Sequence, residues 1–287
     1  IDCINGNGDI ALRYGKSYGR YLTDISRWTA GYIIGREISP QEVDSTNVNN
    51  PSINSYSGNQ FEITVATASE VFVTHMLDET VTYEAQKYSV KRPVSISSWP
   101  TLDPLNHPTE TYTDEDKATY DIAKISMKNI QAGIFASYHA YPYYPNFISE
   151  EPAYLTYSDA EGPNSYLGYL NALKAHYAGM PLIIAEFGVP SSWGSAHQSY
   201  SNMHHGGYSE QQQGDKDMRL MHNIISAGCA GGFMFAWMDE WFKPTWIVAY
   251  LEAFGMYSGG TTIPTRQIWH NLTSPEQNFG ILTFDQA

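Results

Sequence analysis

Short apolar runs recur along the chain, and longer amphipathic stretches separate them. The runs are Gly31–Gly35, Pro93–Ser97, Gly133–Tyr138, Pro181–Ala185 and Gly232–Trp237. The stretches Val65–Tyr88, Asp116–Gln131, Ser165–Tyr177 and Gly214–Ala227 carry apolar residues at the spacing of a helix with one buried face. The runs themselves have the length of buried strands. The alternation therefore predicts βαβ units built on a parallel sheet.

The length of the chain favours a parallel sheet that closes into a barrel. A (β/α) barrel needs about 250 residues, and this chain has 287. The loops after the runs are long and rich in Trp, Tyr, Pro, Asn and His, as expected of the loops that form a barrel's site. We predict an α/β fold, a (β/α)8 TIM-type barrel over residues 1–250, whose first strands lie outside this chain or are too short to recognise. Residues 251–287 are predicted to form a closing segment or the start of a further module.

A doubly wound sheet stays open as an alternative fold. No G-x-G-x-x-G follows any of the runs and no Walker sequence is present, which argues against a nucleotide-binding version of that fold.

Charge and composition exclude several classes of partner. The net charge of −14 opposes binding to nucleic acid or to an anionic membrane surface. No apolar run is long enough to span a bilayer. Cys3 and Cys229 provide neither a disulfide framework nor a metal-type spacing, and we expect no metal and no cofactor. Because the chain begins at Ile1 without Met, its N-terminus is expected to be processed or cut from a longer protein.

Two of the apolar runs lead directly to a glutamate. Glu37 follows Gly31–Gly35, and Glu186 follows Pro181–Ala185. The carboxyl ends of parallel strands meet on one face, so the two carboxylates are expected to converge. Glycoside hydrolysis requires such a pair, because one acid protonates the leaving oxygen while the other attacks or activates water. Taken singly, a Glu at a strand end is more often a loop anchor or an ion-pair partner, and Arg36 next to Glu37 could be such a partner.

The order of the motifs resembles a known superfamily. Gly-x-Glu in "IIGREIS", then "ASYHAYPYYP", "IIAEFG" and "GGFMFAWMDEW" are similar to successive segments of the retaining glycoside hydrolases with a (β/α)8 barrel. That clan includes family 5 cellulases and mannanases and family 2 β-galactosidases, and the resemblance covers roughly residues 30 to 246. It implies a polysaccharide-degrading glycosidase in which Glu37 is the acid/base and Glu186 the nucleophile.

The resemblance also implies roles for neighbouring residues. Tyr138, His139 and Tyr141 are the candidates to contact the nucleophile, and Trp237 is the candidate floor of the sugar site. One position departs from the clan's pattern, because Arg36 stands where the clan usually has Asn. Arginine cannot accept a hydrogen bond and always carries a charge, so this change either alters substrate preference or marks a weakened enzyme.

Other residues near the ends of the runs are candidates for binding sugar. Aromatic rings can stack on the apolar faces of sugars, although ordinary packing explains any single ring as well. The full set of predicted substrate-binding residues is Arg36, Trp99, His107, Tyr138, His139, Tyr141, Trp193, Trp237, Asp239 and Glu240. Further loop aromatics that could line the same cleft are Tyr143, Tyr144, Trp241 and Trp246.

These observations lead to one functional prediction and one rival. We predict a retaining glycoside hydrolase that cleaves a β-linked oligo- or polysaccharide by double displacement, with carboxyl groups about 5 Å apart. A transglycosylase would use the same residues. The rival is a carbohydrate-binding or structural barrel module without catalysis. For a carbohydrate partner we expect an extracellular or periplasmic location; the sequence does not predict the oligomeric state.

Overall fold

The computed structural model describes residues 1–240, 243 and 275–284. The chain divides into two compact units, each assembled from segments that are distant in sequence. Unit 1 comprises Ile1–Arg36, Thr46–Ile96 and Asp121–Phe135, and unit 2 comprises Glu37–Ser45, Ser97–Tyr120 and the described residues from Ala136 onward. Most of the predicted closing segment, together with the candidates Trp241 and Trp246, lies outside the described residues.

Unit 1 contains three small sheets and one long helix. Its strands are β1 (Gly8–Ile10), β2 (Gly19–Tyr21), β3 (Tyr32–Ile34), β4 (Ser55–Ser57), β5 (Phe61–Thr64), β6 (Val94–Ile96) and β7 (Ser126–Met127); its helices are η1 (Ser26–Trp28), α2 (Ala68–Tyr88) and η3 (Ile122–Lys124). β1 pairs antiparallel with β2, β3 pairs parallel with β6, and β4, β5 and β7 form an antiparallel sheet. The helix α1 (Pro40–Asn49) runs from a segment of unit 2 into one of unit 1.

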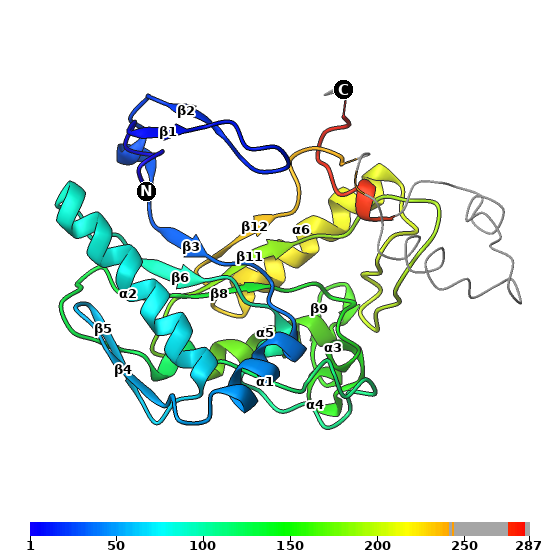
Figure 1. The fold of residues 1–287 in the computed structure, drawn as a ribbon. Helices are drawn as coiled ribbons and strands as arrows, with labels where there is room; N and C mark the ends of the chain where they lie inside the picture. Colours follow the sequence, from blue (N-terminus) through cyan, green and yellow to red (C-terminus); the bar gives the residue numbers. More distant parts are fainter. Residues whose placement is uncertain (241–242, 244–274, 285–287) are drawn as a thin grey trace, which may run out of the picture. The chain divides into compact units, whose positions relative to one another are not determined.

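The helix α2 begins at a well-formed cap and packs on β5. The Thr67 side chain accepts from the backbone N–H of Glu70 while the Glu70 side chain accepts from that of Thr67, a capping box that satisfies two otherwise unpaired donors. Figure 1 shows the helix alongside the β4–β5 hairpin. Leu77 of α2 and Phe61 of β5 are fully buried in this core.

The turn between β4 and β5 is attached to α2 by a buried carboxylate. Asp78 accepts hydrogen bonds from the backbone N–H groups of Asn59 (3.1 Å), Gln60 (2.6 Å) and Phe61 (2.8 Å). A Cβ at Gly58 would lie 2.3 Å from the Asp78 carboxyl carbon, so only glycine allows this close approach. The position of Asn59 and Gln60 is thereby set by α2.

Unit 2 is built around a parallel sheet of three strands. Its strands are β8 (Ala136–His139), β9 (Ser158–Asp159), β10 (Gly162–Pro163), β11 (Leu182–Phe187) and β12 (Gly231–Met234); its helices are η2 (Pro100–Leu102), α3 (Phe147–Glu150), α4 (Pro152–Leu155), α5 (Ser165–His176), α6 (Glu210–Ser226) and η4 (Pro275–Gln277). The sheet has the order β12-β11-β8, and β9 pairs antiparallel with β10. Figure 1 shows α6 running beside β11 and β12.

The predicted eight-stranded barrel is wrong. The described residues contain six α-helices and twelve strands in five separate sheets of two or three strands, none of them closed. A doubly wound sheet is not formed there either. Because the resemblance to the barrel glycosidases implied that closed fold, the assignment to their superfamily is wrong as well.

The barrel prediction failed in part because one of the helices expected between its strands is absent and irregular chain takes its place. Asp116–Gln131, expected to be a helix, contains only the turn η3 and the strand β7, which pairs antiparallel with β5. Its buried residues Ile122, Ile125 and Ile130 are spaced three and five positions apart, a pattern that packs equally well from irregular chain. The antiparallel hairpins β1–β2 and β4–β5 also break the predicted alternation.

Within the described ranges, no helix is both long enough and apolar enough to cross a membrane.

Candidate active site

The end of the parallel sheet in unit 2 brings a histidine beside a glutamate. In the pairing of β8 with β11, His139 is the register partner of Glu186, and the register shifts between Ile184 and Glu186. The backbone N–H of Ala140 donates to the Glu186 carbonyl at 2.9 Å, which continues the pairing past the end of β8. Irregular register at a strand end redirects side chains, and here it places two ionisable groups next to each other.

The second glutamate comes from the segment before α1. Glu37 precedes Ile38, whose carbonyl accepts a hydrogen bond from the Trp99 ring N–H at 2.9 Å. Pro40 then begins α1, where its fixed φ suits the first turn of a helix. The backbone beside Glu37 is therefore anchored by Trp99, one of the residues predicted to bind substrate.

His139 joins the two carboxylates. Its Nδ1 lies 2.8 Å from Oε1 of Glu37 and 3.5 Å from Oε2 of Glu186. The nearest-facing atoms of these three residues all lie within 4.8 Å of one another. The two glutamates that the sequence places at strand ends are thus neighbours in space, and both face the same ring nitrogen of His139.

The Glu186 carboxylate is held by one further donor. The Tyr141 hydroxyl donates to its Oε2 at 3.0 Å. Burial raises the pKa of Glu186, while the charge of His139 and the Tyr141 hydrogen bond lower it; the net shift is upward. Burial and the nearby Glu186 charge also raise the pKa of Tyr141, which keeps its hydroxyl a donor.

His139 is predisposed to carry a proton. Burial lowers the pKa of this imidazole, but the hydrogen bond to Glu37 and the charges of Glu186 and Glu37 outweigh that effect, and the net pKa is raised. Glu37 is the most accessible of the three side chains, at 42% exposed against 30% for Glu186 and 15% for His139. Glu37 can therefore exchange protons with water while Glu186 is more sheltered.

A serine that the sequence reading overlooked completes the hydrogen bonding of His139. Ser97 Oγ lies 3.2 Å from His139 Nε2, and Glu37 faces the other ring nitrogen. The serine, the imidazole and Glu37 therefore form a hydrogen-bonded chain. Such a relay can activate a serine nucleophile, but Ser97 is only 4% exposed and a substrate cannot reach it. Its role here is to orient the ring. Ser97 ends one of the predicted strands, the same signal that identified both glutamates.

The trio of Glu37, His139 and Glu186 could also hold a metal ion. Carboxylate oxygen and imidazole nitrogen are common ligands of zinc, at about 2.0–2.2 Å. His139 would have to lose its proton to bind, which its raised pKa opposes. The raised pKa of His139 therefore favours a protonated imidazole facing the two glutamates over a bound metal ion.

Asp217 holds the chain that leaves β11 just after Glu186. This residue of α6 accepts a hydrogen bond from the backbone N–H of Val189 at 2.9 Å. Gly188 immediately precedes Val189. A Cβ at this position would lie 2.6 Å from the Phe235 carbonyl oxygen, so a side chain cannot be accommodated. Burial raises the pKa of Asp217 to about 7.

We expect the stability of the protein to fall between about pH 4 and pH 7 because of Asp217. Its carboxyl binds a proton more tightly in the folded state than in the unfolded state, so its contribution is fully present below the unfolded pKa of 3.8 and is lost as the pH rises through about 7. The loss amounts to about 4 kcal/mol at most. Asp217→Asn, which retains the acceptor for Val189, should flatten this part of a urea-unfolding profile measured against pH; an unchanged slope would contradict the assignment.

Two of the predicted substrate-binding residues lie in the core instead of at the site. His107 is 2% exposed, stacks on Phe147 with ring centroids 3.5 Å apart, and shares hydrogen bonds with Asp116 and Tyr154. Tyr138 is 1% exposed, with its hydroxyl 2.9 Å from that of Tyr177. In both residues the polar atoms form hydrogen bonds with other buried groups, so a role in core packing explains why each residue is present.

The remaining predicted residues are dispersed. Trp193 is 93% exposed and Trp237 is 71% exposed, the latter beyond the end of β12. Asp239 is buried and accepts from the Gly280 N–H at 2.9 Å, while Glu240 forms an ion pair with Lys243 at 3.3 Å. Arg36 is exposed and belongs to unit 1. Of the predicted residues, the structure thus brings together Glu37, His139, Tyr141 and Glu186, with Trp99 supporting the backbone beside them.

Comparison with known proteins does not assign the chain to a family. No protein-family model matches it, and no curated protein matches it.

Proposed function

We propose that unit 2 is a retaining glycoside hydrolase acting on a β-linked saccharide. The observation that carries the proposal is the pair of carboxylates, Glu37 and Glu186, each of which presents one oxygen within 4.8 Å of an oxygen of the other. Double displacement needs carboxyl groups about 5–5.5 Å apart, whereas inversion needs roughly 6.5–9.5 Å to admit a water. The proposal rests on this geometry and not on any fold-level likeness.

In the first step Glu186 attacks the anomeric carbon. The bond from that carbon to the leaving oxygen breaks, its electron pair stays on the oxygen, and Glu37 supplies the proton that neutralises it. In the second step a water attacks the anomeric carbon, Glu37 removes its proton, and Glu186 departs as a carboxylate. The greater exposure of Glu37 suits the residue that must exchange protons with solvent.

His139 and Tyr141 support these roles. Tyr141 donates to Glu186 and fixes the direction of its lone pairs, and the imidazolium of His139 favours the ionised form of Glu186. His139 lies within hydrogen-bond distance of Glu37 and can orient its carboxyl group, while Glu37 regains its own proton from water in the second step.

The stereochemistry of the product tests the proposal. Aryl β-glycosides of glucose, mannose and galactose are incubated with the protein, and the first-formed sugar is followed by proton NMR before it mutarotates. We expect the β-anomer to appear first, since two displacements restore the original configuration. Initial formation of the α-anomer would exclude the double displacement, and no turnover of any glycoside with saccharide binding intact would favour the non-catalytic module.

His139→Gln is expected to move the acidic limb of the kcat/KM profile to higher pH by about one unit. Without the imidazolium, one influence that lowers the pKa of Glu186 is lost, and Glu186 ionises only at higher pH. His75→Gln serves as the control, because His75 is exposed and pairs with Glu79 on α2 at 3.6 Å. An acidic limb that does not move would show that His139 carries no charge in the working enzyme.

A further inference from the structure

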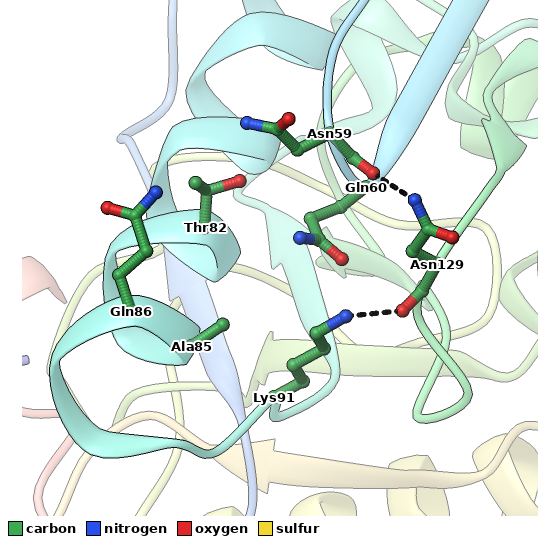
Figure 2. A pocket seen from close by; sticks show the side chains of 7 residues that line it. All are labelled: Asn59, Gln60, Thr82, Ala85, Gln86, Lys91 and Asn129. Carbon is green, nitrogen blue, oxygen red and sulfur yellow. Dashed lines mark hydrogen bonds between the residues drawn. The ribbon is translucent and has the colours of Figure 1, made fainter.

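Unit 1 contains a polar pocket that the proposed chemistry does not use. Its volume is about 510 Å³, within the range of roughly 300–1,000 Å³ typical of small-molecule sites. The polar residues that line it are Asn59, Gln60, Thr82, Gln86, Lys91 and Asn129. Figure 2 shows them approaching from the β4–β5 turn, from α2 and from the loop that carries Asn129.

The lining combines groups that both donate and accept hydrogen bonds. Four of its six polar side chains are carboxamides, and Thr82 adds a hydroxyl. Lys91 supplies the single charge, and Ala85 supplies a methyl group. A ligand hydroxyl, which likewise donates and accepts, matches such a surface more completely than a carboxylate or an amine does.

Two of these side chains are buried with an unpaired polar atom. Gln60 is 6% exposed and Thr82 is 8% exposed. Among the described residues, Gln60 Oε1 and Thr82 Oγ1 have no hydrogen-bond partner. Figure 2 shows both side chains near the middle of the lining group. Buried polar atoms are normally paired, so these two can accept a ligand that donates to an amide oxygen.

The walls of the pocket are held in place. The Asn129 side chain donates to the Asn59 carbonyl at 2.7 Å, and Lys91 Nζ donates to the Asn129 carbonyl at 2.6 Å (Figure 2). The backbone of Asn59 and Gln60 is fixed by Asp78, as described above. A rigid, already formed lining lowers the entropy cost of binding.

We propose that this pocket binds a neutral saccharide through its hydroxyl groups. The buried Gln60 oxygen would accept from one hydroxyl, Thr82 would exchange hydrogen bonds with a second, and the exposed amides would contact the rest. An anionic ligand fits less well, because Lys91 is the only cation in the lining and the chain carries a net charge of −14. The pocket lies in unit 1 and is independent of the proposed hydrolysis at Glu186.

Nitrogen-15 NMR of the full chain tests this binding. The probes are glucose, mannose, galactose, cellobiose and maltose, with inorganic phosphate as the anionic probe, and Glu186→Gln keeps the disaccharides intact. We expect at least one sugar to shift the side-chain and backbone signals of Asn59, Gln60 and Asn129 in a saturable manner. No saturable shift with any sugar, or a shift with phosphate alone, would overturn the proposal.

Matched variants separate binding from folding. Gln60→Met and Thr82→Val keep the shape of each side chain but remove the polar atom, and each is expected to weaken sugar binding by about tenfold or more. Thr80→Val and Gln131→Met make the same changes outside the pocket and should leave the affinity unaltered. Equal affinities for all four variants would overturn the proposal.

The two proposals fail separately. If the NMR signals of the pocket residues respond to sugar but the protein has no glycosidase activity, the proposed function is wrong and the proposed sugar-binding pocket is supported. If the protein hydrolyses a glycoside but no signal of unit 1 responds to sugar, the proposed function is supported and the proposed pocket is wrong.

Discussion

Glu186→Gln is expected to lower kcat for an aryl β-glycoside by roughly a thousandfold or more, with the affinity for the sugar changed only a few-fold. Glutamine has nearly the same shape but cannot attack the anomeric carbon. The hydroxyl of Tyr141 can still donate to the amide oxygen, so the local structure is retained. Initial rates and equilibrium binding of a non-hydrolysed saccharide measure the two quantities separately.

Ser97→Ala distinguishes this chemistry from a serine-based mechanism. The Ser97 hydroxyl faces the far nitrogen of His139, so its loss is expected to reduce turnover by roughly tenfold at most. Glu62→Gln, at a half-exposed glutamate of β5, should have no effect on turnover. A Ser97 variant that is inactive beside an active Glu186→Gln would overturn the assignment and identify the Ser97–His139–Glu37 relay as the reacting group.

Arg92→Met is expected to destabilise the protein by about 3–5 kcal/mol, because it leaves a buried carboxylate without its counter-charge. Glu84 of α2 has a fully buried side chain and forms an ion pair with Arg92, which is itself 12% exposed. Glu84 also accepts from the Tyr32 hydroxyl at 2.6 Å and from the Arg92 backbone N–H at 3.0 Å. Arg92 additionally donates to two backbone carbonyls of unit 1, those of Ser26 at 2.7 Å and Thr29 at 2.9 Å.

The double variant Glu84→Gln/Arg92→Met provides the control for this pair. Removing the carboxylate charge together with the guanidinium should restore part of the lost stability, since neither residue then leaves a buried charge. Urea unfolding of the two single variants and the double variant yields the coupling between them. A double variant whose loss equals the sum of the single losses would show that the two side chains contribute independently.

Much of the local structure could be predicted from the pattern of apolar residues. Each of the five apolar runs overlaps a strand (β3, β6, β8, β11 or β12), and three of the four amphipathic stretches overlap a helix (α2, α5 or α6). Two errors share one cause. Pro40–Asn49 forms α1 although it is mostly polar, and Asp116–Gln131 forms no α-helix although it carries spaced isoleucines. In both segments the secondary structure was decided by capping, by turns and by packing against other segments, and not by the weak apolar spacing.

The candidate site shows where prediction from sequence ends. Strand-end position identified Glu37 and Glu186, because parallel strands present their last residues on one side. His139 is a candidate only through the resemblance to the barrel glycosidases. The same strand-end rule applies to Ser97, whose small side chain does not by itself indicate a site. His107 and Tyr138 have the residue types of a binding site, yet buried partners satisfy them. Burial depends on segments far apart in the chain, which a local pattern does not contain.

The sequence by itself determined the short strands, the main helices and the acidic residue beside each of two strands, since these depend on neighbours a few positions away. Only the tertiary structure decided that the sheets remain small and open, because closure depends on how distant strands pair. It also decided that the shifted register of β11 sets Glu186 beside His139, and that Glu37 faces the same ring nitrogen of that histidine. Hydrogen-bond partners and charge separations arise from contacts between distant segments, and these contacts give the two glutamates their different surroundings.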